Sequence, residues 1–164
     1  MKKSKKAVKQ FKRTYKIKGV PSAHELKRVI KEFGFEVYGY SESEDKLHET
    51  KTYNLSKEKP AFTYVRGNQK IVFYDDRVNE IDLLRVLSHE IGHIYYNHLH
   101  RKEDIFDTDI NKEWEANLFA VYLLSPVNYK DYIVKTILSF CLVTMCFSFG
   151  THYDGRFSKQ IPIF

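Results

Sequence analysis

Two histidines and a glutamate lie together in the middle of this 164-residue chain, in the order His89-Glu90-Ile91-Gly92-His93. His89 and His93 are four residues apart, so on a helix their side chains leave the same face one turn apart. Two imidazoles placed in this way can reach one zinc ion at about 2.0–2.1 Å. Glu90 is then beside the water that zinc activates and can take its proton as a general base. The pattern therefore predicts a metal-dependent hydrolytic site.

A catalytic zinc site usually has three protein ligands and an open position for water, so a third ligand is needed. In one form of this motif a glycine and a third histidine follow on the same helix, but here those positions hold Tyr96 and Leu99. The nearby His98 and His100 are out of register with that motif. We interpret them as ordinary helix-end histidines, which the helix dipole favours.

A second segment, Glu113-Trp114-Glu115-Ala116-Asn117, follows the first and offers a carboxylate instead. Glu113 and Asn117 share a helical face because they are four residues apart, whereas Glu115 points elsewhere. We predict Glu113 as the third ligand and expect Asn117 to orient a ligand by a hydrogen bond. The alternative is that Glu113 is a solvated acid near a helix start.

Two helices must hold these residues in place. Apolar side chains recur at spacings of three and four and predict a helix from about residue 80 to about residue 98, which Asn79 can cap. Gly92 lacks a side chain and leaves room there for a neighbouring element to approach closely. The second segment lies on a predicted helix over residues 111–124, which ends before Pro126.

Farther upstream the sequence predicts a helix and then a strand. Ser22 and Glu25 have the spacing of a capping box, and apolar residues at helical spacing follow them. Gly34 ends this helix, and residues 35–38 alternate in polarity like a strand.

A β-hairpin is predicted between these elements and the helix that carries the histidines. Residues 61–65 and 71–74 are rich in β-forming side chains and are separated by a turn that contains Gly67-Asn68. Residues 41–59 are polar without a clear period, and we expect a loop there with at most a short strand. The expected fold class is α+β, with a small antiparallel sheet packed on the two site-bearing helices.

The N-terminal segment, residues 1–18, is strongly basic. It holds nine Lys or Arg residues and no acid, so the rest of the chain has 18 basic and 21 acidic residues. A block of like charges usually stays solvated and mobile, and we expect a basic N-terminal arm. The alternatives are contact with nucleic acid or with an anionic membrane surface.

The C-terminal segment, residues 129–164, is apolar in its first part. Residues 136–151 contain no charged side chain, and with the residues just before them, from 132, they approach the length of a membrane span. We expect either a membrane anchor or a segment that packs on the domain. With no export signal, and with only Cys141 and Cys146 as cysteines, a cytoplasmic location is expected.

Taken together, three stretches resemble the ImmA/IrrE family of metallopeptidases. They are LSHEIGHIY at 87–95, EWEANLFA at 113–120 and LLSP at 123–126. The resemblance covers roughly residues 20–128 and places a zincin-like domain at about 19–128. It implies a zinc peptidase with ligands His89, His93 and Glu113 and the general base Glu90.

The resemblance also implies a substrate, because family members studied as regulators cleave a helix-turn-helix transcriptional repressor. Such cleavage derepresses genes of a mobile element or a stress response. An alternative is a non-catalytic protein that keeps the fold and either binds the repressor without cutting it or acts as a toxin–antitoxin partner, although the intact Glu90 argues against this. A nucleic-acid-binding protein is the least favoured hypothesis, because no recognition helix is evident and only the basic segment supports it.

Overall fold

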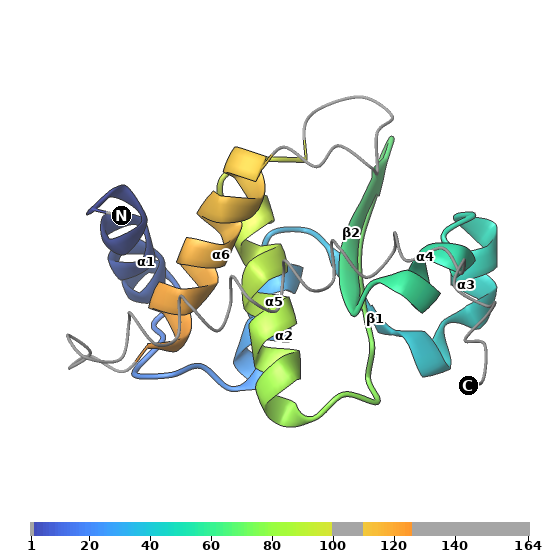
Figure 1. Cartoon of the computed structure of the whole chain (residues 1–164), viewed down its shortest axis with the longest axis horizontal. Helices are drawn as coiled ribbons and strands as arrows, with labels where there is room; N and C mark the ends of the chain where they lie inside the picture. The colour runs from blue at the N-terminus through green and yellow to red at the C-terminus, as the bar shows by residue number, and fades with distance from the viewer. Residues whose placement is uncertain (1, 100–109, 126–164) are drawn as a thin grey trace, which may run out of the picture.

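A computed structural model of the chain describes residues 2–99 and 110–125. The chain begins with two helices, a short strand and three short helices. A hairpin follows, and then two longer helices (Figure 1). In chain order the elements are α1 (Lys2–Thr14), α2 (Ala23–Glu32), β1 (Glu36–Gly39), the 3-10 helix η1 (Tyr40–Glu42), α3 (Glu44–Glu49), α4 (Tyr53–Glu58), β2 (Ala61–Arg66), β3 (Gln69–Tyr74), α5 (Glu80–Tyr95) and α6 (Ile110–Leu124).

The elements form three layers, with the sheet between two groups of helices. Figure 1 shows α1, α6, α5 and α2 on one side of β2, and α3 and α4 on the other. Each side has its own apolar core, because alternate strand residues point to opposite faces. Val72 and Tyr74 join the core under the long helices, while Ile71 and Phe73 join the core under α3 and α4. The fold class is α+β, as predicted.

The three strands lie in the order β1-β3-β2. β2 and β3 pair antiparallel through the predicted hairpin, and Gly67 has the left-handed φ of 58° that such short turns require. β1 pairs with β3 in parallel, so the sheet is mixed, whereas the sequence suggested antiparallel pairing throughout. Parallel pairing is possible because η1, α3, α4 and β2 lie between the two strands in the chain.

Residues 41–59 are helical in part, which differs from the loop expected there. The helices α3 and α4 have six residues each, too few to give a recognisable period. Leu47 and Leu55 are their buried residues and pack against Phe62 and Phe73 of the sheet. These short helices cover the face of the sheet that is remote from α5.

The basic N-terminal segment also differs from the mobile arm expected. It forms α1, and Val8 and Phe11 on its apolar side are buried against the rest of the molecule. The Phe11 ring lies 5.2 Å from Phe119 of α6 and 5.7 Å from Tyr95 of α5, centroid to centroid. The helix forms despite its like charges because burial of its apolar face stabilises it.

The expected apolar tail, residues 129–164, lies outside the described residues, as does the domain boundary expected near residue 128. Within 2–99 and 110–125, no helix combines the length and the apolar character needed to cross a membrane. Whether the tail spans a membrane or packs on the domain stays a prediction.

Candidate metal centre

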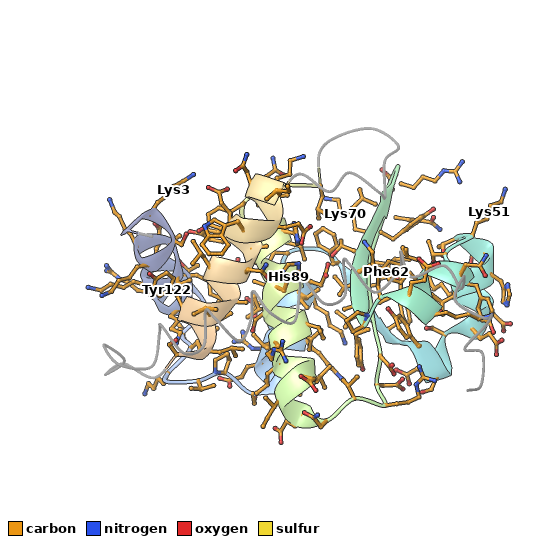
Figure 2. All side chains as sticks on the ribbon, viewed as in Figure 1. Lys3, Lys51, Phe62, Lys70, His89 and Tyr122 are labelled. Atoms are coloured by element: carbon orange, nitrogen blue, oxygen red, sulfur yellow. The ribbon has the colours of Figure 1, made fainter. Side chains whose placement is uncertain are left out.

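The middle of α5 holds His89, Glu90 and His93 on a helix with a well-defined start. Asn79 caps that start, since its side chain accepts a hydrogen bond from the backbone N–H of Asp82 at 3.0 Å. The two histidine side chains share a face, and their Nε2 atoms lie 2.9 Å apart. Figure 2 shows His89 in the middle of α5, where this helix runs beside α6. The predicted helix is therefore present and presents both imidazoles together.

Glu113 of α6 completes a cluster with these two histidines. Its Oε2 lies 3.2 Å from Nε2 of His89, and its Oε1 lies 3.3 Å from Nε2 of His93. All the donor atoms lie within 4.8 Å of one another. Ligands about 2.0–2.1 Å from a tetrahedral ion are about 3.3 Å apart, which is close to these separations. The three residues chosen from the sequence could therefore together hold one small metal ion.

The ionisation of Glu113 suits this arrangement. Burial alone would raise the pKa of the Glu113 carboxyl, but hydrogen bonds with His89 and His93 outweigh it and hold that pKa well below its usual range. Burial alone would lower the pKa of His89, yet the hydrogen bond with Glu113 and the charge of Glu90 raise it overall. Glu113 is thus ionised at neutral pH, which is the form that binds a divalent cation.

Asn117 lies behind His89. The His89 Nδ1 and the Asn117 Oδ1 atoms are 2.9 Å apart. An amide oxygen can only accept, so Nδ1 of His89 carries a hydrogen and donates it to Asn117. This leaves Nε2, which faces Glu113, as the ring nitrogen that could bind a metal.

Glu90 is buried beside the cluster and has a partner that the sequence analysis missed. Glu90 is only 7% exposed, and its Oε2 accepts a hydrogen bond from the Thr63 hydroxyl at 2.5 Å. Thr63 lies on β2 between Phe62 and Tyr64, which point into the opposite core. Strand alternation could have indicated that Thr63 faces α5.

His98 and Glu115 also contact the site, although neither was predicted to. The Nδ1 atoms of His98 and His93 are 3.2 Å apart, and the His98 Nε2 lies 3.3 Å from the Glu115 Oε2. The sequence analysis took His98 for an ordinary helix-end residue. Asn97 precedes His98 and has a left-handed backbone conformation, which asparagine adopts more readily than most residues. This asparagine was the sequence signal that the chain could turn sharply there and bring His98 back to α5.

The contact between the two helices depends on a missing side chain. A Cβ built at Gly92 would lie 2.9 Å from the Cα and 3.0 Å from the carbonyl oxygen of Ala116. Those are backbone atoms, so they could move only if α6 moved. Gly92 therefore allows the close approach that the sequence suggested, and this approach brings Glu113 to the histidines.

Comparison with protein families gives a match that covers the candidate centre. Residues 44–132 match the model of the peptidase M78 family, described as an IrrE N-terminal-like domain. The chain belongs to this family. The match spans more than half of the chain and includes both helices of the candidate centre, which confirms the resemblance seen in the sequence. Comparison with curated proteins and with solved structures gives no match.

Membership of the peptidase M78 family indicates a metallopeptidase-like role for this chain. The cluster of His89, His93 and Glu113 agrees with that role, because its donors could hold a metal ion. The matched segment begins after α1, α2 and β1, so the N-terminal helices lie outside it.

Proposed function

We propose that this protein is a zinc-dependent endopeptidase in which His89, His93 and Glu113 are the metal ligands and Glu90 is the general base. The observation that carries the proposal is the convergence of three donor side chains from two helices, with a buried carboxylate next to them. Two imidazoles and one carboxylate with an open position form a ligand set used by catalytic zinc in peptidases. Zinc, when bound, supplies Lewis-acid chemistry: it polarises a peptide carbonyl and activates water.

The chain itself supplies the proton transfers. Glu90 takes a proton from the attacking water and gives it to the leaving amine, which restores the carboxylate for the next turnover. The Thr63 hydroxyl holds one carboxylate oxygen, so the other oxygen is left to face the water. Burial of Glu90 limits competing contacts with bulk solvent.

The substrate we propose is a helix-turn-helix transcriptional repressor, cleaved in an extended segment. Support comes from the resemblance of the sequence motifs to the ImmA/IrrE family, in which members studied as regulators cleave such repressors. Among the described strands β2 lies at the edge of the sheet, and Thr63 on this strand contacts Glu90. A peptide that pairs with β2 would therefore pass close to the general base.

Metal content is the first measurement that tests the proposal. We expect the purified full-length chain to hold about one zinc ion, and His93→Ala to lose it because one of three ligands is gone. His24→Ala, a change at an exposed histidine of α2, serves as the matched control and should keep the metal. A wild-type protein that takes up no zinc when zinc is supplied would contradict the proposal.

Glu90→Gln separates catalysis from binding. We expect this variant to keep zinc and to lose at least about 10²-fold in the rate of repressor cleavage, since general bases typically contribute 10²–10⁴-fold. The measurement is the appearance of repressor fragments over time with wild type and variant side by side. Cleavage at an undiminished rate would overturn the role of Glu90. Tight binding of the repressor by zinc-loaded wild type without any cleavage would favour the non-catalytic alternative.

A further inference from the structure

The chain turns back after the end of α5, so that His98 lies against α5 itself. Asn97 has a left-handed φ of 60°, its N–H donates to the Ile94 carbonyl at 3.1 Å, and the His98 N–H donates to the His93 carbonyl at 2.9 Å. These are the two hydrogen bonds of a Schellman motif. The turn places the His98 ring beside the His93 ring, with its side chain only 9% exposed.

The contacts around His98 fit one arrangement of hydrogen atoms. His93 directs Nε2 toward Glu113 and His89, so a metal held there needs the lone pair on Nε2 and leaves the hydrogen on Nδ1. That Nδ1–H can donate to Nδ1 of His98, 3.2 Å away. His98 then carries its hydrogen on Nε2 and donates to Glu115 at 3.3 Å. Every polar atom in the series has a partner of the correct type.

We propose that His98 and Glu115 are positioning residues for His93. The His98 imidazole lies between the Glu115 carboxylate and the proposed ligand His93. The pair fixes the tautomer and the ring orientation of His93, and the negative charge of Glu115 strengthens His93 as an electron donor. The proposal rests on the proposed metal site. It gives each ligand histidine its own support, since Asn117 already holds His89.

Lys3 of α1 contacts the outer end of this series but adds little. Its Nζ lies 3.1 Å from the Glu115 Oε1, yet its side chain is 76% exposed. Exposed ion pairs of this kind contribute little to stability, and salt screens them. The buried His98 is therefore the member whose loss matters most.

Zinc affinity in a double-mutant cycle tests the proposal. On the full-length chain we expect His98→Ala and Glu115→Ala each to weaken zinc binding by about 10–100-fold in competition with a chromophoric chelator. The double variant should be no weaker than the worse single variant, because both act through the same contact. His24→Ala is the matched control, and urea unfolding checks that each variant is folded.

A second measurement reports the hydrogen positions directly. In ¹⁵N NMR spectra of the zinc-loaded protein we expect His93 as the Nδ1–H tautomer and His98 as the Nε2–H tautomer. The opposite tautomer at His98, unchanged zinc affinity in both single variants, or strictly additive losses in the double variant would overturn the positioning role. If wild type binds no zinc, the proposed metal site itself fails, which is a distinct result.

The exposed face of α1 carries several like charges that destabilise the helix. Lys5, Lys9 and Arg13 follow one another at spacings of four, and Lys6 lies on the same side, all of them exposed. Like charges at this spacing destabilise a helix, and cations near its N-terminus oppose the helix dipole. The helix has no acid in its first turn to offset this.

We infer that this cationic face of α1, formed by Lys5, Lys6, Lys9 and Arg13, binds double-stranded nucleic acid. The apolar side chains Val8 and Phe11 are buried against α6 and its neighbours, so α1 has no apolar face left to insert into a membrane. The thirteen residues of α1 extend for about 20 Å, enough to follow several phosphates of a duplex. The contact is to the backbone and carries no base specificity.

Salt-dependent binding to a fluorescent 20-base-pair duplex tests this surface in the full-length chain. Changing Lys5, Lys6, Lys9 and Arg13 to Gln should weaken binding at least tenfold and reduce the salt slope by about three to four. The control replaces four exposed lysines elsewhere, namely Lys31, Lys51, Lys57 and Lys70. Equal losses in both variants, no duplex binding by wild type, or binding only to anionic vesicles would overturn the inference.

Discussion

At the scale of single residues, each reactive side chain of the candidate centre has a partner that restricts it. His89 contacts Asn117, His93 contacts His98, and Glu90 contacts Thr63. An unrestrained histidine would lose side-chain entropy on binding a metal, and a prior hydrogen bond reduces that loss. The site is therefore preorganised by side chains drawn from α6, β2 and the turn after α5.

The two acids of α6 are expected to differ in their effect on the metal. Glu113→Ala removes a proposed ligand, whereas Glu115→Ala removes only the support of His98. We expect the first change to weaken zinc binding at least about tenfold more than the second, whose loss should stay within about 10–100-fold. Parallel chelator titrations of the two variants measure this difference. Equal affinities would mean that the ligand was assigned to the wrong carboxylate.

At the scale of elements, the short motif on α6 is explained by its contacts with α5 and the turn after it. Glu113 faces the two histidines, Glu115 faces His98, Ala116 lies against Gly92, and Asn117 faces His89. Four residues within one helical turn and a half thus each have a different contact.

Gly92→Ala should disturb the packing of α5 on α6. The added methyl group meets backbone atoms of Ala116, and such overpacking costs about 1–3 kcal/mol, which outweighs a gain of about 1 kcal/mol in helix propensity. Because α6 must shift, zinc affinity should fall as well. Urea unfolding and chelator titration measure the two effects, with Ile81→Ala, an exposed change in the same helix, as control. Full retention of zinc affinity would show that α6 does not need this close approach.

The start of α2 should stabilise the fold in a pH-dependent way. Hydrogen bonds from the backbone and hydroxyl of Ser22 hold the pKa of the Glu25 carboxyl below its usual range. Since the folded pKa is depressed, this contribution is present above the unfolded pKa of 4.5 and is lost as pH falls through the folded value.

Glu25→Gln keeps the shape of the capping box and removes its charge. We expect the variant to have a lower free energy of unfolding than wild type at pH 7, with the difference shrinking below about pH 4.5. Urea unfolding at several pH values measures this. A difference that grows toward acid pH would contradict the assignment of the carboxylate as the stabilising form.

At the scale of the whole molecule, the sheet separates two cores with different tasks. The core under α3 and α4 closes the far face of the sheet, and the larger core joins α1, α2, α5 and α6 (Figure 1). The helix α1 lies outside the family match but inside this larger core, since Phe11 contacts aromatic rings from the residue that caps the end of α2, from α5 and from α6. The N-terminal segment therefore supports the two helices that hold the candidate centre.

Phe11→Ala tests whether α1 is a structural part of the domain. Phe11 is fully buried, and replacing a buried Phe by Ala typically costs about 3–5 kcal/mol. Urea unfolding of the full-length chain should show a loss of this size, while Lys9→Ala on the exposed face should change stability by less than about 0.5 kcal/mol. An unchanged stability for Phe11→Ala would instead agree with the mobile arm expected from the charge pattern.

The sequence by itself determined the elements that local signals encode. Periodicity, the Asn79 cap and the Gly67-Asn68 turn were sufficient to predict α5, α6 and the hairpin, because these signals act between residues close in the chain. Helical spacing also selected Glu113 as the residue that faces the histidines. The roles of those residues in metal binding and catalysis stay predictions.

Only the tertiary structure decided which separate elements meet. Thr63 reaches Glu90 from a strand, and Glu115 reaches His98 because α6 packs closely on α5 at Gly92. The packing of α1 likewise depends on the buried Phe11. Its role could not be recognised from the sequence because the segment around it is strongly basic. Such contacts depend on the burial of apolar faces that are distant in the chain, and no local pattern specifies how two faces will align.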